Sequence, residues 1–146
     1  MKKDKKFIIS IDQGTTSSRA ILFDLKGQPV YSSQKEFTQY FPKSGWVEHD
    51  PEEIWSTTKK TLNDVIKKSK KIKGNILTIG ITNQRETTIL WDKKTGKAVY
   101  NAIVWQDRRQ EEFCKKLRKQ NKETLIFNRT GLLIDSYFSA TKIKWI

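Results

Sequence analysis

One short turn near the start of the chain gathers side chains that bind phosphate: an acid, a glycine, three hydroxyls and an arginine. The glycine allows the backbone to approach an anion closely and to adopt a positive φ, and successive N–H groups of a tight turn form an anion-binding concavity. The acid can hold Mg²⁺ directly or through water, and the arginine offers charge to phosphate oxygens. From the residues alone, a plain hairpin turn explains the pattern equally well. The candidate phosphate-binding residues are Asp12, Gly14, Thr15, Thr16, Ser17 and Arg19.

The common glycine-rich nucleotide motifs do not account for this turn. Neither G-x-x-x-x-G-K-[ST] nor G-x-G-x-x-G occurs in the chain,. The turn also lies between two expected strands, whereas a Walker loop joins a strand to a helix. Any phosphate binding here therefore has to use a different loop architecture.

A second candidate site contains an adjacent arginine and glutamate, Arg85 and Glu86. A guanidinium is a fixed fork of donors and a carboxylate accepts hydrogen bonds, so such a pair can hold two hydroxyls of a small polyol. A surface ion pair worth ~0–1 kcal/mol is the commoner meaning of this pattern, and the residues alone favour it. By the same standard, Trp105 and Tyr137 are interpreted as ordinary core aromatics.

Two further reactive side chains are predicted to be structural. His49 precedes an expected helix start, where a lone histidine is more often structural than catalytic. Cys114 lies on the inward face of an expected helix and is predicted to be an inert small hydrophobe. It is the only cysteine, which excludes a disulfide-built domain,.

The first elements that must position these residues are expected to be strands. Apolar and β-branched residues predict strands over Phe7–Asp12, Arg19–Asp24 and Pro29–Phe37,. Short turns separate the strands, which indicates an antiparallel meander. A loop over Tyr40–His49 is expected to follow.

A helix with clear start signals comes next. Asp50 can cap it, Pro51 suits its first position, and Glu53 has the spacing of a capping box,. The apolar residues that follow recur on one face, as in a helix that covers a sheet. Gly74 is expected to end the segment.

The second half of the chain predicts more strands and another helix. Ile76–Thr82 is expected to be a buried strand, with further strands at Thr87–Asp92 and Ala102–Trp105,. Asp107–Lys119 is expected to be helical. Its predicted inward residues are Phe113, Cys114 and Leu117. Together these elements predict an α/β domain with a mixed sheet.

The last segment, Ser139–Ile146, is predicted to begin a helix with a serine cap, and no Gly, Asn or Pro stop signal follows,. We therefore expect the chain to be truncated. Apolar Ile143, Trp145 and Ile146 are expected to lack the residues against which they would pack.

Composition and charge argue against several classes of protein, namely nucleic-acid-binding, membrane-spanning and secreted proteins. The chain has 146 residues, 36% of them hydrophobic, and a net charge of +13 from 29 basic and 16 acidic residues. The basic residues are 23 Lys and 6 Arg, and their scatter favours a solvated surface over a nucleic-acid site,. No apolar run approaches the ~20 residues of a membrane span. The basic start lacks a signal-peptide core, so a cytoplasmic location is expected.

Several blocks resemble one enzyme family. The turn around Gly14 resembles the first phosphate loop of the actin-like ATPase superfamily, which implies a ribonuclease H-like fold. Longer blocks, in the same order, resemble the glycerol kinases of the FGGY carbohydrate kinase family. These blocks are Asp12–Arg19, Gly45–Pro51, Gly80–Thr88, Asn101–Gln106 and Thr130–Trp145.

The resemblance implies transfer of the ATP γ-phosphoryl group to glycerol, with Mg²⁺ as cofactor. It implies that Arg85 and Glu86 bind glycerol, that Trp105 covers the carbon backbone, and that Tyr137 closes the pocket. Residues 14–17 would cradle phosphate, Arg19 would neutralise its charge, and Asp12 would organise Mg²⁺ through water.

The resemblance also sets expectations about what the chain lacks. Residues 1–146 would be the N-terminal part of the first kinase domain, because in relatives the general base and the second domain lie beyond it. The chain alone is therefore expected to be inactive, and the full-length form to be a homo-oligomer. A related kinase for another polyol or sugar, and a non-catalytic or decayed fragment, remain alternatives.

Overall fold

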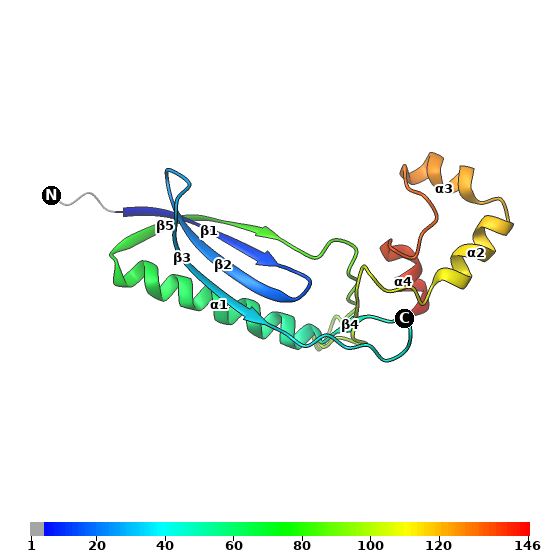
Figure 1. Ribbon diagram of the computed structural model, residues 1–146, viewed down its shortest axis with the longest axis horizontal. Helices are drawn as coiled ribbons and strands as arrows, with labels where there is room; N and C mark the ends of the chain where they lie inside the picture. The colour runs from blue at the N-terminus through cyan, green and yellow to red at the C-terminus, as the bar shows by residue number, and fades with distance from the viewer. Residues whose placement is uncertain (1–4) are drawn as a thin grey trace. The chain divides into compact units, whose positions relative to one another are not determined.

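The computed structural model describes residues 5–146, so the first four residues of the basic start lie outside the described part. The chain divides into two compact units (Figure 1). The first unit is Met1–Thr38 with Glu52–Gln84, and the second unit is Gln39–Pro51 with Arg85–Ile146. The predicted phosphate loop belongs to the first unit, and the predicted polyol residues belong to the second.

A four-stranded mixed sheet forms the first unit. Strands β1 (Lys5–Gln13), β2 (Ser17–Asp24) and β3 (Pro29–Glu36) are antiparallel neighbours, which confirms the predicted meander. Strand β5 (Gly74–Thr82) pairs in parallel with β1, giving the order β3-β2-β1-β5. The parallel pair makes the sheet mixed, as the sequence predicted.

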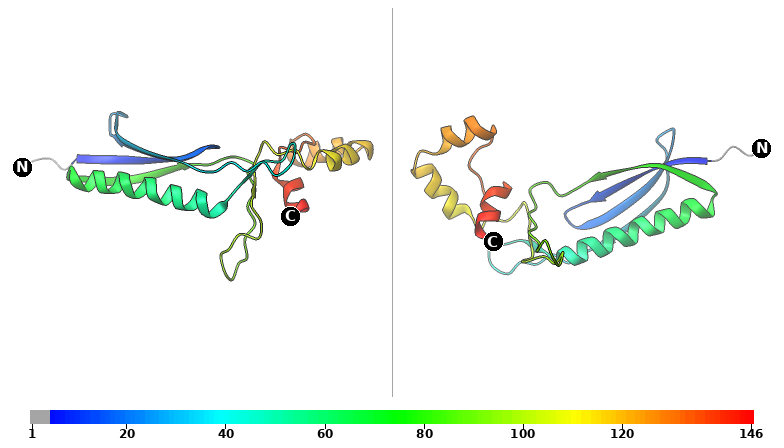
Figure 2. Two further views of the ribbon diagram at one scale, coloured as in Figure 1. Left: turned by 60° about the horizontal axis from the view of Figure 1, so that its bottom comes forward. Right: turned by 180° about the vertical axis from the view of Figure 1, so that it is seen from behind.

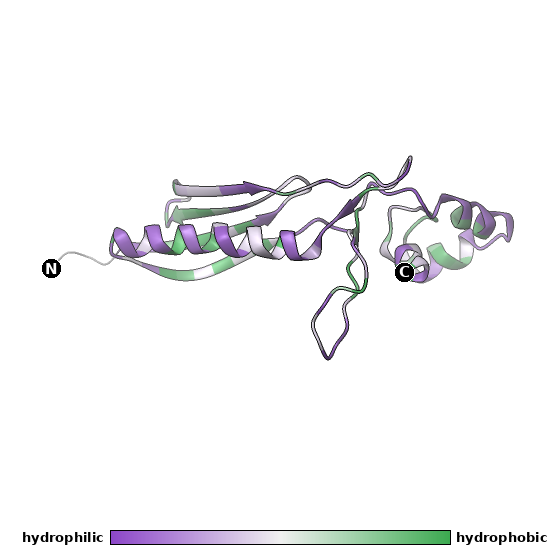
Figure 3. Ribbon diagram, turned by 90° about the horizontal axis from the view of Figure 1, so that it is seen from below, coloured by the Kyte–Doolittle hydropathy of each residue, from purple (hydrophilic) through white to green (hydrophobic). Residues whose placement is uncertain are grey.

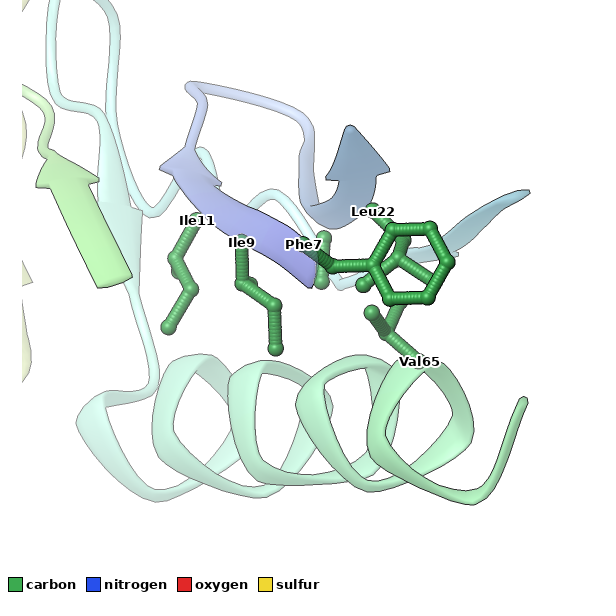
Figure 4. Close-up of a cluster of buried hydrophobic side chains, with 6 residues drawn as sticks. Phe7, Ile9, Ile11, Leu22 and Val65 are labelled. Carbon is green, nitrogen blue, oxygen red and sulfur yellow. The ribbon is translucent and has the colours of Figure 1, made fainter. Parts of the chain in front are cut away.

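Helix α1 (Pro51–Lys71) lies along one face of this sheet (Figures 1 and 2). Its ribbon alternates between hydrophilic and hydrophobic colour, as expected for a helix with one face on a sheet (Figure 3),. Inward side chains of β1 and β2 meet Val65 of the helix (Figure 4). This core comprises Phe7, Ile9, Ile11, Ala20, Leu22 and Val65.

The prediction that β5 is buried was wrong. Leu77, Ile79 and Ile81 are 54%, 43% and 69% exposed. An uninterrupted apolar run is typical of a strand covered on both faces. Here β5 is an edge strand, and within the described residues its apolar side chains are only partly covered.

The end of α1 also differs from the expectation. Lys73, with a φ of 54°, takes the left-handed position after the helix, and Gly74 already belongs to β5. A Cβ atom at Gly74 would lie 2.0 Å from a ring carbon of Phe7. The glycine is therefore required by close packing rather than by a helix stop.

The second unit is less regular than predicted. Its two strands, β4 (Glu48–His49) and β6 (Ala102–Ile103), form a short antiparallel pair, so the expected loop ends in a strand. The expected strand at Thr87–Asp92 is reduced to two isolated bridges, one of them between Trp91 and Ala98. The segment that contains these bridges extends outward and returns as a narrow loop (Figure 2, left).

Three helices complete the second unit: α2 (Glu111–Lys119), α3 (Glu123–Thr130) and α4 (Ser139–Trp145). Helix α2 begins four residues later than expected, and α3 was not predicted from the sequence. Cys114 is the buried residue of α2, as predicted. Across the described residues, no helix is both long enough and apolar enough to cross a membrane.

The predicted serine cap of α4 was wrong, because Phe138 occupies the capping position without a side-chain cap and Ser139 is the first helical residue. Trp145 has packing partners within the chain. Its ring makes edge-on contacts with Trp46 at 5.4 Å and Tyr100 at 5.2 Å between centroids. The expectation that Trp145 lacks partners was therefore also wrong.

Replacing Gly74 with alanine should destabilise the first unit by about 1–3 kcal/mol, because the added methyl overlaps the Phe7 ring,. Gly80 is the matched control: it lies in the same strand, and a Cβ atom there meets nothing within 4 Å. Denaturant unfolding measures both variants. Equal midpoints for Gly74→Ala and Gly80→Ala would contradict the packing argument.

Candidate functional site

The predicted phosphate loop is the connection of the β1–β2 hairpin. Antiparallel register places Asp12 directly opposite Arg19. The Arg19 guanidinium donates to Asp12 Oδ2 at 2.9 Å, and both side chains are partly exposed. The two charged groups predicted for Mg²⁺ and phosphate are thus together, and each neutralises the other.

The backbone of Gly14 behaves differently from the prediction. It is not among the residues with positive φ, so that part of the prediction was wrong. Its N–H donates to the Ser17 carbonyl at 2.9 Å, and a Cβ atom would approach that oxygen to 3.1 Å. The missing side chain therefore allows the close approach of the backbone within the hairpin, and the Gly14 N–H is already hydrogen-bonded there.

The hydroxyl residues of the loop differ in their surroundings. Thr16 is exposed, and its carbonyl accepts from the Phe37 N–H at 3.3 Å. Thr15 is half-buried, and Ser17 Oγ accepts from the Gln34 amide at 2.9 Å. The loop is therefore accessible at its tip and hydrogen-bonded at its base.

The residues that fix the hairpin on α1 were not predicted from the sequence. Ser18 is fully buried, and its hydroxyl lies 2.9 Å from Thr57 Oγ1 and 3.0 Å from Thr58 Oγ1. The Gln13 amide also donates to Thr58 Oγ1, at 3.2 Å. The hydroxyl residues among the buried positions of α1, which include Thr57 and Thr58, were the signal that could have revealed this anchor.

The loop is compatible with Mg²⁺ that arrives with a nucleotide. Asp12 provides a single, partly exposed carboxylate, and no group of three or more potential metal-ligating side chains exists in residues 5–146. Mg²⁺ commonly takes one or two carboxylates together with substrate phosphates and water. The donor set fits that mode better than an all-protein metal cage.

In the second unit, Glu86 is held in an unusual conformation. Its φ of 65° lies in the left-handed region, where a residue with a side chain is strained,. Its Oε2 accepts from the N–H and the hydroxyl of Ser139, at 2.9 and 2.8 Å. Its neighbour Arg85 is exposed and makes no hydrogen bond or ion pair with any other described residue.

Trp105 and Tyr137 come together, as an aromatic pocket requires. Their ring centroids are 6.1 Å apart at an angle of 68°. Both line a cavity of about 620 Å³, whose wall also carries acidic side chains. Those acids are Asp107, Glu111 and Asp135. Ser139 lies two residues after Tyr137, and it also contacts Glu86. Three of the four predicted polyol residues, Glu86, Trp105 and Tyr137, therefore lie near the start of α4.

A buried charge cluster supports this pocket and was not predicted. Arg109 donates to Glu48 Oε1 at 2.7 Å and to Asp107 Oδ2 at 2.8 Å, and all three side chains are essentially buried. The guanidinium carbon lies 3.8 Å from the centre of the Trp46 ring and 4.6 Å from that of Trp145. This cluster connects the pocket wall at Asp107 to strand β4.

The surroundings of Glu48 keep it charged. Burial raises the pKa of its carboxyl, but hydrogen bonds and the positive charge of Arg109 outweigh burial, so the pKa lies below its ordinary value,. The donors to its two oxygens are Arg109, the Tyr100 hydroxyl and the Asn101 amide. The cluster is therefore stable only while Glu48 remains ionised.

The two side chains predicted to be structural are both buried. His49 has its Nε2 atom 2.7 Å from Gln39 Oε1. Burial raises the pKa of the Cys114 thiol, which makes it a poorer nucleophile,. Their surroundings agree with the structural interpretation.

Residues 7–146 match the FGGY family of carbohydrate kinases, N-terminal domain. The chain is 60% identical over 142 residues to the glycerol kinase of Alkaliphilus metalliredigens, covering 97% of this chain and 28% of the relative. It is 58% identical over 146 residues to the glycerol kinase of Malacoplasma penetrans, covering 100% of this chain and 29% of the relative. The chain thus spans less than a third of the length of these relatives.

Solved structures of the family share the fold. The crystal structure of Plasmodium falciparum glycerol kinase with ADP superposes with a TM-score of 0.91 at 41% identity, covering 97% of this chain and 28% of that one. A gluconate kinase from Lactobacillus acidophilus gives a TM-score of 0.87 at 25% identity, with the same coverage of the two chains. These similarities confirm the predicted actin-like ATPase fold.

Replacing Arg109 with leucine should destabilise the second unit by about 3–5 kcal/mol, because two buried carboxylates would lose their partner,. Tryptophan fluorescence during denaturant unfolding measures this change, since Trp46 lies against the guanidinium. The neighbouring Arg108 is exposed and provides the control variant Arg108→Leu. A loss no larger than that of the control would refute the role of the cluster.

The stability of the second unit should fall as the pH drops below about 4.5, the ordinary value for a glutamate. Because the pKa of Glu48 is lower in the folded chain, its contribution is full above the unfolded value and disappears as the pH falls through the folded value. Glu48→Gln should remove this dependence while lowering stability at neutral pH. Urea unfolding between pH 3 and 7 tests this, with Glu123→Gln, an exposed site, as the control. An unchanged acid limb in Glu48→Gln would count against the prediction.

Proposed function

The chain belongs to the FGGY family of carbohydrate kinases, and we propose that it provides the phosphate loop and the polyol-binding residues for ATP-dependent phosphorylation of glycerol. The product of this reaction is glycerol 3-phosphate. One observation carries the choice of substrate. Relatives described as glycerol kinases are about 60% identical to this chain, whereas gluconate and xylulose kinases of known structure are 25% and 26% identical.

Phosphoryl transfer depends mainly on positioning and on neutralising charge, and the first unit offers groups for both. We assign phosphate binding to the loop over residues 14–17, charge neutralisation to Arg19, and Mg²⁺ to Asp12. When bound, Mg²⁺ would neutralise phosphate charge. Because Asp12 and Arg19 form an ion pair in the hairpin, a bound Mg²⁺–nucleotide has to compete with that pair.

We assign polyol binding to the second unit. Ser139 occupies one carboxylate oxygen of Glu86, while Oε1 has no hydrogen bond to another described residue and can accept from a hydroxyl. Arg85 offers donors, and the Trp105 ring can cover the carbon chain. Tyr137, 37% exposed, offers its hydroxyl at the cavity wall.

The proposal extends to partners and location. ATP or ADP and glycerol are the proposed ligands, with Mg²⁺ as cofactor. A nucleic-acid partner is not expected, because most of the cations are scattered lysines. Of the cations, we assign only Arg19 to phosphate binding and only Arg85 to polyol binding. A cytoplasmic location and a homo-oligomeric full-length form remain predictions. We assign no general base among the described residues.

Activity can be tested by joining this chain to the remaining part of a glycerol kinase that is 60% identical to it. The hybrid should phosphorylate glycerol in preference to xylulose and gluconate, as measured by ADP formation. Glu86→Gln should lower kcat/KM for glycerol by about 10–100-fold, the effect of losing one hydrogen bond to a charged group. The exposed Glu112 provides the control variant Glu112→Gln.

Two outcomes of this experiment would contradict the proposal. A hybrid that prefers xylulose or gluconate would assign the chain to another FGGY kinase. An active hybrid in which Glu86→Gln and Glu112→Gln behave alike would remove Glu86 from the polyol site.

A further inference from the structure

Lys142, in helix α4, is the feature of the second unit that the proposed function does not use. Its relative exposure is 0%, although it carries an amino group at the end of a long side chain. A fully buried lysine is rare and costs free energy unless its N–H groups are satisfied. Its amino group forms no ion pair with a carboxylate of the described residues, so it is not part of a simple salt bridge.

The amino group instead donates to two backbone carbonyls. One is the carbonyl of Glu86, at 2.9 Å, and the other is the carbonyl of Tyr137. Nζ also lies 5.8 Å from the centre of the Tyr137 ring. Both carbonyls belong to residues predicted to bind the polyol, and these residues are distant in sequence.

Glu86 is the residue that most needs such support. With a φ of 65° it occupies a strained conformation that persists only when its surroundings fix it,. The first turn of α4 contacts it twice: Ser139 holds the carboxylate, and Lys142 holds the carbonyl. Together these contacts fix both ends of the residue and leave Oε1 without a partner among the described residues.

We propose that Lys142 is a positioning residue for polyol binding, because its amino group fixes the backbone of Glu86 and Tyr137 at the same time. The polyol part of this inference rests on the proposed function. The positioning part concerns only contacts within the chain, so the two can fail separately.

Charge is consistent with this role. Burial lowers the pKa of Lys142 to about 8, and the negative charges of Glu86, Asp107 and Asp135 act in the opposite direction. At neutral pH the group is therefore mostly an ammonium. A charged donor makes stronger hydrogen bonds to carbonyls than a neutral one.

The test replaces Lys142 with methionine, which keeps the length and apolar stem and removes the N–H donors. Lys144 is the matched control, since it is an exposed lysine in the same helix. Amide hydrogen exchange is measured by NMR on the 146-residue chain. In Lys142→Met, the Ser139 amide, which donates to Glu86, should exchange at least 10-fold faster, while Lys144→Met should stay within 2-fold of the unmodified chain.

A reference amide separates positioning from a general loss of stability. The Val104 N–H donates to the Val47 carbonyl at 3.0 Å in the same unit, a hydrogen bond that includes neither Glu86 nor a residue of α4. Selective acceleration at Ser139 supports the proposal. An unchanged Ser139 rate, or equal acceleration at Ser139 and Val104, overturns it.

Glycerol titration then tests the functional part in the same samples. The Trp105 indole signal should shift with glycerol in the unmodified chain, and Lys142→Met should weaken that response at least 10-fold. If the unmodified chain shows no response while Ser139 exchange is selectively faster in the variant, positioning stands and glycerol binding by this site fails. A response of equal strength in both chains overturns the role of Lys142 in polyol binding.

A measurement on the unmodified chain covers the case in which Lys142→Met does not fold. The Lys142 side-chain protons next to Nζ should show nuclear Overhauser contacts to the α-protons of Glu86 and Tyr137. The absence of both contacts would overturn the proposal without any variant.

Discussion

The second unit depends on the burial of one guanidinium. Arg109 lies between two carboxylates and against aromatic faces, and these partners come from three segments of the chain: Trp46 with Glu48, Asp107, and Trp145. A buried charge of this kind is tolerated only when its hydrogen bonds are complete. That requirement fixes strand β4 through Glu48 and the pocket wall through Asp107. The aromatic ring of Trp145 also places the end of α4 against the guanidinium. The candidate polyol pocket is therefore built on a polar centre rather than on an extended apolar core.

In the first unit, buried hydroxyl groups take the place of buried charges in fixing the candidate site. A conventional apolar core joins the sheet to α1, but the hairpin that carries the candidate phosphate loop is fixed by Ser18 against Thr57 and Thr58. The hairpin also pairs Asp12 with Arg19. The same two charges that suit Mg²⁺ and phosphate thus satisfy each other, which keeps the loop ordered without a ligand.

Predictions from the sequence were correct for elements that residues close together in the chain specify. The meander and α1 follow from apolar periodicity and from turn and cap residues, which act over a few positions. It failed where burial depends on distant partners: β5 has the composition of a buried strand yet is an exposed edge. At Thr87–Asp92, β-branched residues suggested a strand, but pairing is limited to isolated bridges. Ser139 resembled a cap, although its hydroxyl binds Glu86.

The sequence by itself determined the β1–β2 hairpin and the resemblance that joins Glu86, Trp105 and Tyr137 in one site. These features depend on strand period, short turns and recognisable blocks. Only the tertiary structure decided the left-handed backbone of Glu86, its support by Lys142 and the burial of Arg109. Each of these arises from hydrogen bonds between residues far apart in the chain, and no local pattern of residues specifies such contacts.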